Sequence, residues 1–206
     1  MGLLVGQVFW LALAVAVTGI LHMFVVKADL LSAFKIPIDG GRTLGGEPIF
    51  GPNKTWRGVF FMIAGAAFVG SVQGLAGGAW AAGAGVEVID FAAWGARWGA
   101  PDGLACYVIG YAGVNAVMGL GYALGELPNS FIKRRLAIDA GKMSRGAVGA
   151  LFFLIDQADS VVAALLLGSV VFGFSWQVVV AGSLSLTALH LAINGSLYVV
   201  KVRKNL

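Results

Sequence analysis

Apolar residues gather along the chain into five long runs that are separated by shorter polar segments. A helix needs about 20 mostly apolar residues to cross a membrane, and each run has about that length. The first run begins close to Met1, with no Lys or Arg before it and no small-residue cleavage site after it, so we expect a retained helix rather than a removable signal peptide. The five runs are approximately Leu3–Val26, Val59–Trp80, Leu104–Leu124, Ala147–Phe172 and Trp176–Val200. This pattern predicts an all-α, polytopic integral membrane protein with about five transmembrane helices, in a single membrane-embedded domain over residues 1–206.

The composition excludes the main alternatives to a membrane protein. Hydrophobic residues make up 59% of the chain and charged residues 12%, whereas soluble domains have about 25% charged residues. The 31 glycines follow no three-residue period, which excludes collagen. One cysteine, Cys106, can form neither an intrachain disulfide nor a cysteine-cluster metal site.

The distribution of Lys and Arg predicts the orientation. Of the 14 basic residues, 13 lie in the segments 27–57 and 126–145 and in the tail from Lys201, and Arg97 alone lies in the loop between the second and third runs. Because basic residues concentrate in cytoplasmic loops, we expect the N-terminus outside, the C-terminus in the cytoplasm, and an active site that faces the cytoplasm at the cell membrane.

Two acids interrupt the fourth apolar run. Asp156 and Asp159 are three residues apart, so a helix places them on one face, followed by Ser160. Each ionised carboxylate at a span centre costs at least ~2.5 kcal/mol and needs compensation. Paired carboxylates are suitable ligands for Mg²⁺. The alternative is a pair of helix-end acids neutralised by Lys or Arg from a neighbouring segment.

The segment after the third run reads GELPNSFIKRRL. If it is helical, Glu126, Ser130, Lys133 and Arg134 share one face, with Pro128 at a tolerable position in the first turn. Clustered cations of this kind suit a polyphosphate. A basic patch that only enforces topology and attracts lipid head groups is the alternative.

A second polar segment, GPNKTWRG, leads into the second run and presents Asn53, Lys54, Thr55 and Arg57. It does not match a P-loop, because Pro and Asn separate the glycine from the lysine. Basic side chains and backbone N–H groups at the start of a helix favour the binding of an anion. An ordinary turn at the membrane entry would have the same sequence pattern.

In the last run, His190, Asn194 and Tyr198 recur every four residues and form one polar stripe. Such a stripe either makes hydrogen bonds between helices or lines a substrate cavity. His22 in the first run has no charged or amide-bearing companion at helical spacing, so we interpret it as structural.

Four segments together resemble a known family. GPNKTWRG, GELPNSFIKRRL, IDQADS and the His-x-x-x-Asn helix are similar, in order and spacing, to the CDP-archaeol synthase family, a relative of the CDP-diacylglycerol synthases (phosphatidate cytidylyltransferases). Members usually have Gly-Asp where this chain has Gly125-Glu126. The Gly-His-Gly-Gly stretch of bacterial-type relatives is missing here, which favours the archaeal type. The serine that follows Asp159, Ser160, instead resembles the bacterial-type branch.

The resemblance implies a membrane enzyme that uses Mg²⁺ and CTP to convert an archaetidic- or phosphatidic-acid-type lipid phosphate into a CDP-lipid, releasing pyrophosphate. Asp156, Asp159 and Lys133 would be catalytic, and Glu126 would join the two aspartates as metal ligands. The residues expected to bind substrate are Asn53, Lys54, Thr55, Arg57, Ser130, Arg134, His190 and Asn194. No nucleic-acid partner is expected, and the sequence leaves open whether a second copy completes a homodimer.

Three rival interpretations remain at this stage. Intramembrane acids also occur in transporters and channels, although these rarely place ten basic residues in two short segments beside such acids. Asp39-Gly40-Gly41-Arg42 imitates the beginning of the CDP-alcohol phosphotransferase signature, but the remainder of that signature is missing. A non-catalytic scaffold would have little use for acids inside a span.

Overall fold

The computed structural model describes residues 2–140, 142 and 146–201 of the 206-residue chain. Five long helices match the five predicted runs and are long and apolar enough to cross a membrane, which confirms the all-α, five-span fold. The basic residues Arg145, Arg203 and Lys204 lie outside the described residues. The long helices are α1 (Gly2–Lys27), α2 (Trp56–Gly83), α4 (Leu104–Arg135), α5 (Gly146–Phe172) and α6 (Trp176–Val199). Shorter elements connect them, namely the 3₁₀ turn η1 (Ser32–Phe34), a hairpin of β1 (Thr43–Leu44) and β2 (Glu47–Pro48), and α3 (Phe91–Arg97).

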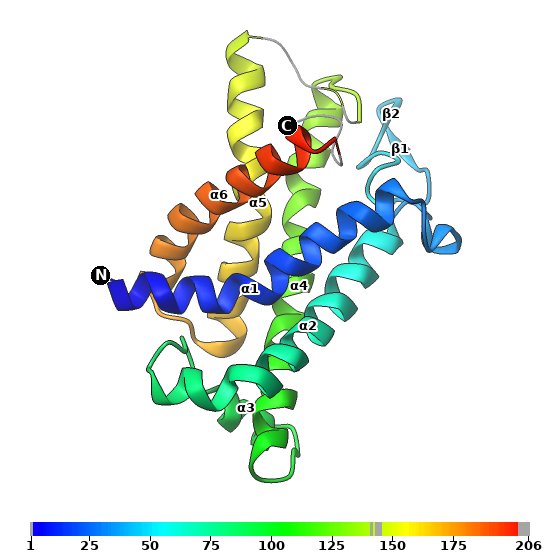
Figure 1. Cartoon of the computed structure of the whole chain (residues 1–206). Helices are drawn as coiled ribbons and strands as arrows, with labels where there is room; N and C mark the ends of the chain where they lie inside the picture. The colour runs from blue at the N-terminus through cyan, green and yellow to red at the C-terminus, as the bar shows by residue number, and fades with distance from the viewer. Residues whose placement is uncertain (1, 141, 143–145, 202–206) are drawn as a thin grey trace.

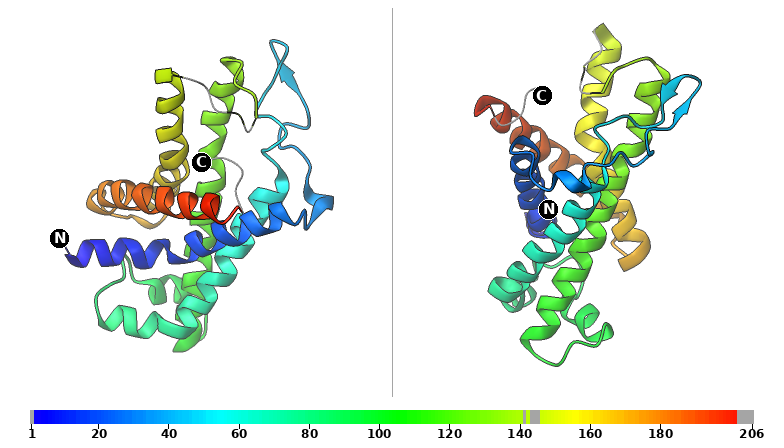
Figure 2. Two further views of the ribbon diagram at one scale, coloured as in Figure 1. Left: turned by 45° about the horizontal axis from the view of Figure 1, so that its top comes forward. Right: turned by 90° about the vertical axis from the view of Figure 1, so that its right-hand side faces the viewer.

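Helix α4 lies at the centre of the bundle (Figure 1) and packs against α2, α3 and α5. Helix α1 packs against α2 and α6, and α6 also contacts α5. The hairpin and the C-terminal part of α4 lie at one end of the molecule, while α3 lies at the other, as the turned views also show (Figure 2). We name the first of these the charged end, because residues 27–57 and 126–135 belong to it.

Glycines allow the central helices to approach closely. A Cβ at Gly70 of α2 would lie 2.6 Å from the carbonyl oxygen of Tyr111 in α4. On the opposite side of α4, a Cβ at Gly121 would lie 2.8 Å from the Cα of Ala164, and one at Gly125 would lie 2.7 Å from the carbonyl oxygen of Asp159. Small residues at such contacts are the usual way in which membrane helices pack. Because the backbones of α4 and α5 nearly touch, the residues that follow Gly125 emerge beside α5.

The structure corrects the prediction for Pro128. We expected it in the first turn of a separate helix, but α4 continues through it to Arg135, and Pro128 is inside the helix. A proline inside a helix costs about 3 kcal/mol, so other contacts must hold this part of α4. They are the close packing of Gly125 on α5 and the bonds that Arg135 makes to the hairpin.

Two side chains fix the loop at the charged end. The Asp39 carboxylate accepts hydrogen bonds from the backbone N–H groups of Gly41, Phe50 and Gly51 at 2.9, 2.9 and 3.2 Å. Partial burial acts to raise the pKa of Asp39, but the backbone N–H donors outweigh it and hold the pKa below its usual value. Arg135 donates to the carbonyl oxygens of hairpin residues 44, 47 and 48. The hairpin is therefore attached to the end of α4.

A polar network closes the opposite end of the bundle. Trp10 Nε1 donates to the Tyr111 hydroxyl at 2.6 Å, and this hydroxyl donates to Glu87 Oε1 at 2.7 Å. Gln73 of α2 donates to the carbonyl oxygen of Trp10 at 2.7 Å. The ring of Tyr111 stacks on Phe91 with 4.0 Å between centroids. These contacts join α1, α2, α3 and α4 far from the charged end.

The contact between α3 and α4 provides a test of this packing. A Cβ at Gly110 of α4 would overlap the carbonyl oxygen of Phe91, which is backbone and cannot swing away. We expect Gly110→Ala to lower the stability of the protein by about 1–3 kcal/mol, the usual cost of overpacking. The measurement is thermal unfolding in detergent. Gly6→Ala is the control, because a Cβ there meets no atom within 4 Å, and a loss of equal size in both variants would contradict the packing.

Candidate active site

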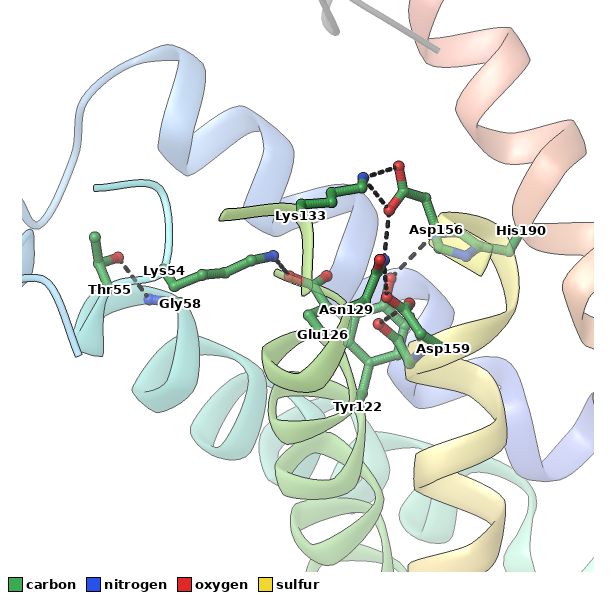
Figure 3. A network of polar contacts seen from close by, with 11 residues as sticks. Lys54, Thr55, Gly58, Tyr122, Glu126, Asn129, Lys133, Asp156, Asp159 and His190 are labelled. Carbon is green, nitrogen blue, oxygen red and sulfur yellow. Dashed lines mark hydrogen bonds and ion pairs between the residues drawn. The ribbon is translucent and has the colours of Figure 1, made fainter. Parts of the chain in front are cut away.

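A network of one lysine, one amide and two carboxylates joins α4 to α5 at the charged end (Figure 3). Lys133 Nζ lies 2.5 Å from each carboxylate oxygen of Asp156. Asn129 Nδ2 donates to Asp156 Oδ1 at 2.6 Å and to Asp159 Oδ2 at 2.8 Å. Asp159 also accepts the backbone N–H of Ser160 at 2.6 Å. The three residues predicted to be catalytic, Asp156, Asp159 and Lys133, therefore lie together.

Asn129 is a member of this network that the sequence analysis did not include. It belongs to a row at four-residue spacing on α4, Gly121, Gly125, Asn129 and Lys133, and this whole row faces α5. The spacing of the two glycines was visible in the sequence. If the same four-residue spacing is continued from Gly125, it reaches Asn129 and then Lys133, the side chains that meet the acids of α5.

The pairing with Lys133 explains how Asp156 is tolerated within an apolar helix. The Lys133 side chain is 14% exposed and the Asp156 side chain 34% exposed, so the ion pair is shielded in part from water. A charge in this position needs an opposite charge nearby. Neutralisation by a neighbouring lysine was the alternative considered for the two acids, and the structure shows such a pair.

The donor set around the two aspartates fits Mg²⁺. Among the described residues, no three His, Cys, Asp or Glu side chains gather as a metal centre. Magnesium, however, is usually held by one or two carboxylates together with water and substrate phosphates. Asn129 Oδ1 is buried and has no hydrogen-bond partner within the described part of the chain, so one amide oxygen beside the two carboxylates is available.

Glu126, predicted as a third metal ligand, forms an ion pair with Lys54. The side chains of Lys54 and Glu126 are 23% and 36% exposed, and Figure 3 shows Lys54 reaching from the loop before α2 to α4. The pair joins the GPNKTWRG and GELPNSFIKRRL segments, which are far apart in the sequence.

Two residues predicted to bind substrate have structural partners. Thr55 is the N-cap of α2, and its side chain accepts the backbone N–H of Gly58 at 3.4 Å. The Arg57 side chain is 5% exposed. It donates to Asp29 Oδ1 at 2.9 Å and to the carbonyl oxygen of Leu30 at 3.0 Å. Arg57 therefore fixes the segment that follows α1, while Thr55 fixes the first turn of α2.

Arg134 is a buried cation that has no bonded partner in the described part of the chain. It is 7% exposed and lies under the loop at Gly51, where its Cδ and Nη1 approach within 3.6 and 3.7 Å of the position of a Cβ on that glycine. Within the described residues its guanidinium makes no hydrogen bond and no ion pair, and Nε is fully buried. Ser130, one turn earlier on α4, is also buried.

The polar stripe on α6 makes contacts between helices and also faces a cavity. His190 Nδ1 lies 2.9 Å from the carbonyl oxygen of Gln157, and Nε2 lies 3.1 Å from the Tyr122 hydroxyl. Asn194 Nδ2 donates to Gln157 Oε1 at 2.8 Å. Tyr198, the third residue of the stripe, is 47% exposed. Both interpretations of His190 and Asn194 are thus compatible with their positions.

One cavity of about 560 Å³ connects the charged end to the apolar interior. Eight of the predicted site residues line it, whereas Ser130, Lys133, Arg134 and Asp159 do not. The eight are Asn53, Lys54, Thr55, Arg57, Glu126, Asp156, His190 and Asn194. Its apolar part includes Val15, Met62, Met118, Leu165, Leu186 and Leu189.

The fold and this site define a polytopic membrane protein with a charged, partly intramembrane site. The family model described as CarS-like, CDP-archaeol synthase, matches residues 103–205. A CDP-archaeol synthase of Halobacterium salinarum is 31% identical over 197 residues, covering 92% of this chain and 93% of the relative. A CDP-archaeol synthase of Methanocaldococcus jannaschii is 27% identical over 161 residues, covering 77% of this chain and 76% of the relative.

A solved structure has the same fold. It is described as an intramembrane enzyme for archaeal membrane lipid biosynthesis, with a TM-score of 0.56 and 23% identity, and the match covers 90% of this chain and 91% of that one. The chain belongs to the CDP-archaeol synthase family. The prediction of a CTP-dependent lipid cytidylyltransferase is thereby confirmed, and the transporter or channel alternative is not supported.

Proposed function

We propose that this enzyme joins CTP to an archaetidic-acid-type lipid phosphate, one with ether-linked isoprenoid chains, at the charged end of the bundle. The observation that carries the proposal is the cavity that continues from the charged end between apolar helices. The cavity has a charged part and an apolar part, and a lipid phosphate likewise has an anionic head and apolar chains. The archaeal type of acceptor is favoured because the named relatives are CDP-archaeol synthases.

Cations around the cavity provide sites for the phosphate groups. Lys54 lines the cavity, and Lys133 lies beside it on Asp156. Arg134 supports the nucleotide assignment most directly, because it is a buried charge with no hydrogen bond or ion pair among the described residues. Such a charge is costly, and a bound anion would neutralise it. Guanidinium groups bind phosphates in a bidentate manner. We assign Lys133 and Arg134 to the triphosphate of CTP, and Lys54 to the lipid phosphate.

Asp156 and Asp159 would hold Mg²⁺, with Asn129 beside them. The ion would neutralise phosphate charge as pyrophosphate leaves. Lys133 then has a second role, because its ion pair orients the Asp156 carboxylate. Glu126 would position Lys54 through their ion pair.

The chemistry requires positioning more than proton transfer. An oxygen of the lipid phosphate attacks the α-phosphorus of CTP, a new P–O bond forms, and the bond to the departing pyrophosphate breaks. A phosphate monoester has a second pKa near 6, so it is already an anionic nucleophile at neutral pH. No strong general base is needed, and alignment with charge stabilisation supplies the rate.

Substitution of the two aspartates tests the function. We expect Asp156→Asn and Asp159→Asn each to reduce CDP-lipid formation from labelled CTP by about 10²-fold or more, because each removes a charge that acts on the reacting phosphates. Folding should persist, since a neutral amide is easier to bury than a carboxylate. Asp102→Asn is the control, because Asp102 is exposed and lies in the loop before α4, at the opposite end of the bundle. Near-normal turnover in both site variants would refute the assignment.

Arg134 provides a separate test of nucleotide binding. We expect Arg134→Ala to lower kcat/KM for CTP by about 10²-fold, because a phosphate-binding cation in a low-dielectric site contributes several kcal/mol. Lys27→Ala removes an exposed cation at the end of α1 and should have an effect below about 1 kcal/mol. Steady-state kinetics with varied CTP makes the comparison. Equal, mild effects in the two variants would contradict nucleotide binding by Arg134 and would indicate that it only stabilises the loop at Gly51.

We also propose that the charged end faces the cytoplasm, because 13 of the 14 basic residues belong to the segments 27–57 and 126–145 and to the tail from Lys201. In a Cys106→Ala background, a cysteine at exposed position 102 should react with an impermeant reagent applied to intact cells. A cysteine at exposed position 42 should react only after lysis. Labelling of position 42 in intact cells would contradict this orientation and place the charged end outside the cell.

A further inference from the structure

His22, which we interpreted from the sequence as structural, lies on the wall of the cavity. It belongs to the face of α1 that lines the cavity, together with Val15, Gly19 and Val26. Its ring stacks on Phe61 of α2, with 5.5 Å between centroids and 26° between planes. Gly58, in the first turn of α2, faces the ring edge, and a Cβ there would lie 3.5 Å from Cε1 and 3.6 Å from Nε2. His22 thus lies where the charged end meets the apolar part of the cavity.

The ring nitrogens of His22 are not used by the fold. Within the described residues, neither nitrogen takes part in a hydrogen bond or an ion pair, in contrast to His190, both of whose nitrogens have partners. The charged groups that act on it electrostatically include Glu126 of α4, Arg57 of α2 and Lys54 of the loop, and each of these has an ion-pair partner elsewhere. A polar group in such a partly buried position costs about 1–3 kcal/mol if it stays unsatisfied.

The position defines which part of a lipid would meet His22. In the proposed function the lipid phosphate lies near Lys54, and the lipid chains lie along Val15 and Leu186. The part of the cavity between these two regions, where His22 lies, would then hold the oxygens that link the phosphate to the chains. These oxygens accept hydrogen bonds, and a neutral imidazole has one N–H donor. Phe61 fixes the plane of the ring, so the donor keeps one direction.

We infer that His22 is a positioning residue that donates a hydrogen bond to the phosphate-proximal oxygens of the lipid substrate. This inference rests on the proposed function of the cavity. His22 does not take part in bond making. It aligns the attacking phosphate by holding the part of the lipid next to it.

Two substitutions separate hydrogen bonding from packing. His22→Phe keeps a ring that can stack on Phe61 but removes the donor, while His22→Gln keeps a donor without the ring. We expect His22→Phe to raise the KM for the lipid phosphate about 3- to 10-fold, the range of one hydrogen bond, with the KM for CTP unchanged. We expect His22→Gln to restore most of the affinity. Phe24→Leu on the outer face of α1 is the control, since Phe24 is 48% exposed.

The alternative outcomes are distinct. An unchanged lipid KM in His22→Phe, or a rise in the KM for CTP alone, would overturn the inference. Equal losses in both variants, with lowered melting temperatures, would assign His22 to packing and would also overturn it.

A binding measurement separates this inference from the proposed function. If the unaltered enzyme forms no CDP-lipid, the proposed function fails. Equilibrium binding of a short-chain archaetidic-type lipid phosphate, measured without CTP on the unaltered protein and both variants, then tests His22 alone. Weaker binding by His22→Phe, with recovery in His22→Gln, supports the inference, and equal binding by all three proteins refutes it.

Discussion

The near-contact of α4 and α5 at Gly121 and Gly125 determines the position of the polar network that joins Lys133 and Asn129 to Asp156. At a usual interaxial distance of 8–10 Å, longer side chains would be needed to connect the two helices. Because the glycines bring the backbones together, Asn129 and Lys133 reach Asp156 directly. The same near-contact supports α4 beyond Pro128, so the helix can carry Arg134 and Arg135 to the loop. A larger residue at either glycine would move the acids and the cations apart together.

The two ends of the bundle use polar groups in different ways. At the end near α3, hydrogen bonds among Trp10, Tyr111 and Glu87 pair donors with acceptors. Burial there raises the pKa of Glu87, which favours a neutral, static contact. At the charged end, Arg134 and the nitrogens of His22 remain without hydrogen bonds within the described residues. This difference is expected if one end only holds helices together while the other must accept a ligand.

The sequence predicted the five spans and most of the site, because both depend on strong local signals. Long apolar runs predict the helices. Carboxylates are unusual inside such a run, so Asp156 and Asp159 are recognised as candidate site residues without knowledge of how the helices pack. Thr55 and Arg57 show the limit of this approach. Their residue types suit phosphate binding, but Thr55 bonds locally to Gly58 as the N-cap of α2, and Arg57 bonds to Asp29, which only the fold brings near.

Pro128 was misjudged, Asn129 was left out, and the surroundings of His22 could not be read from the sequence, all for related reasons. Local rules treat proline as a helix start, but tertiary contacts with α5 and the hairpin carry the helix through it. Asn129 is significant only because Gly125 brings α5 close. The groups beside His22, such as Phe61 and Glu126, belong to α2 and α4, so the sequence of α1 alone does not reveal them. In each case the missing information was a contact between helices.

The attachment of the hairpin by Arg135 has an evolutionary consequence. Arg135 binds three backbone carbonyl oxygens rather than side chains, and every residue type supplies such an oxygen. Residues 43–48 can therefore diverge in sequence among descendants of this protein without releasing the hairpin, provided that its turn is kept. Drift in this segment would alter the surface beside the site and leave its position intact, which makes the hairpin a place where new surface properties can evolve at little cost to the fold.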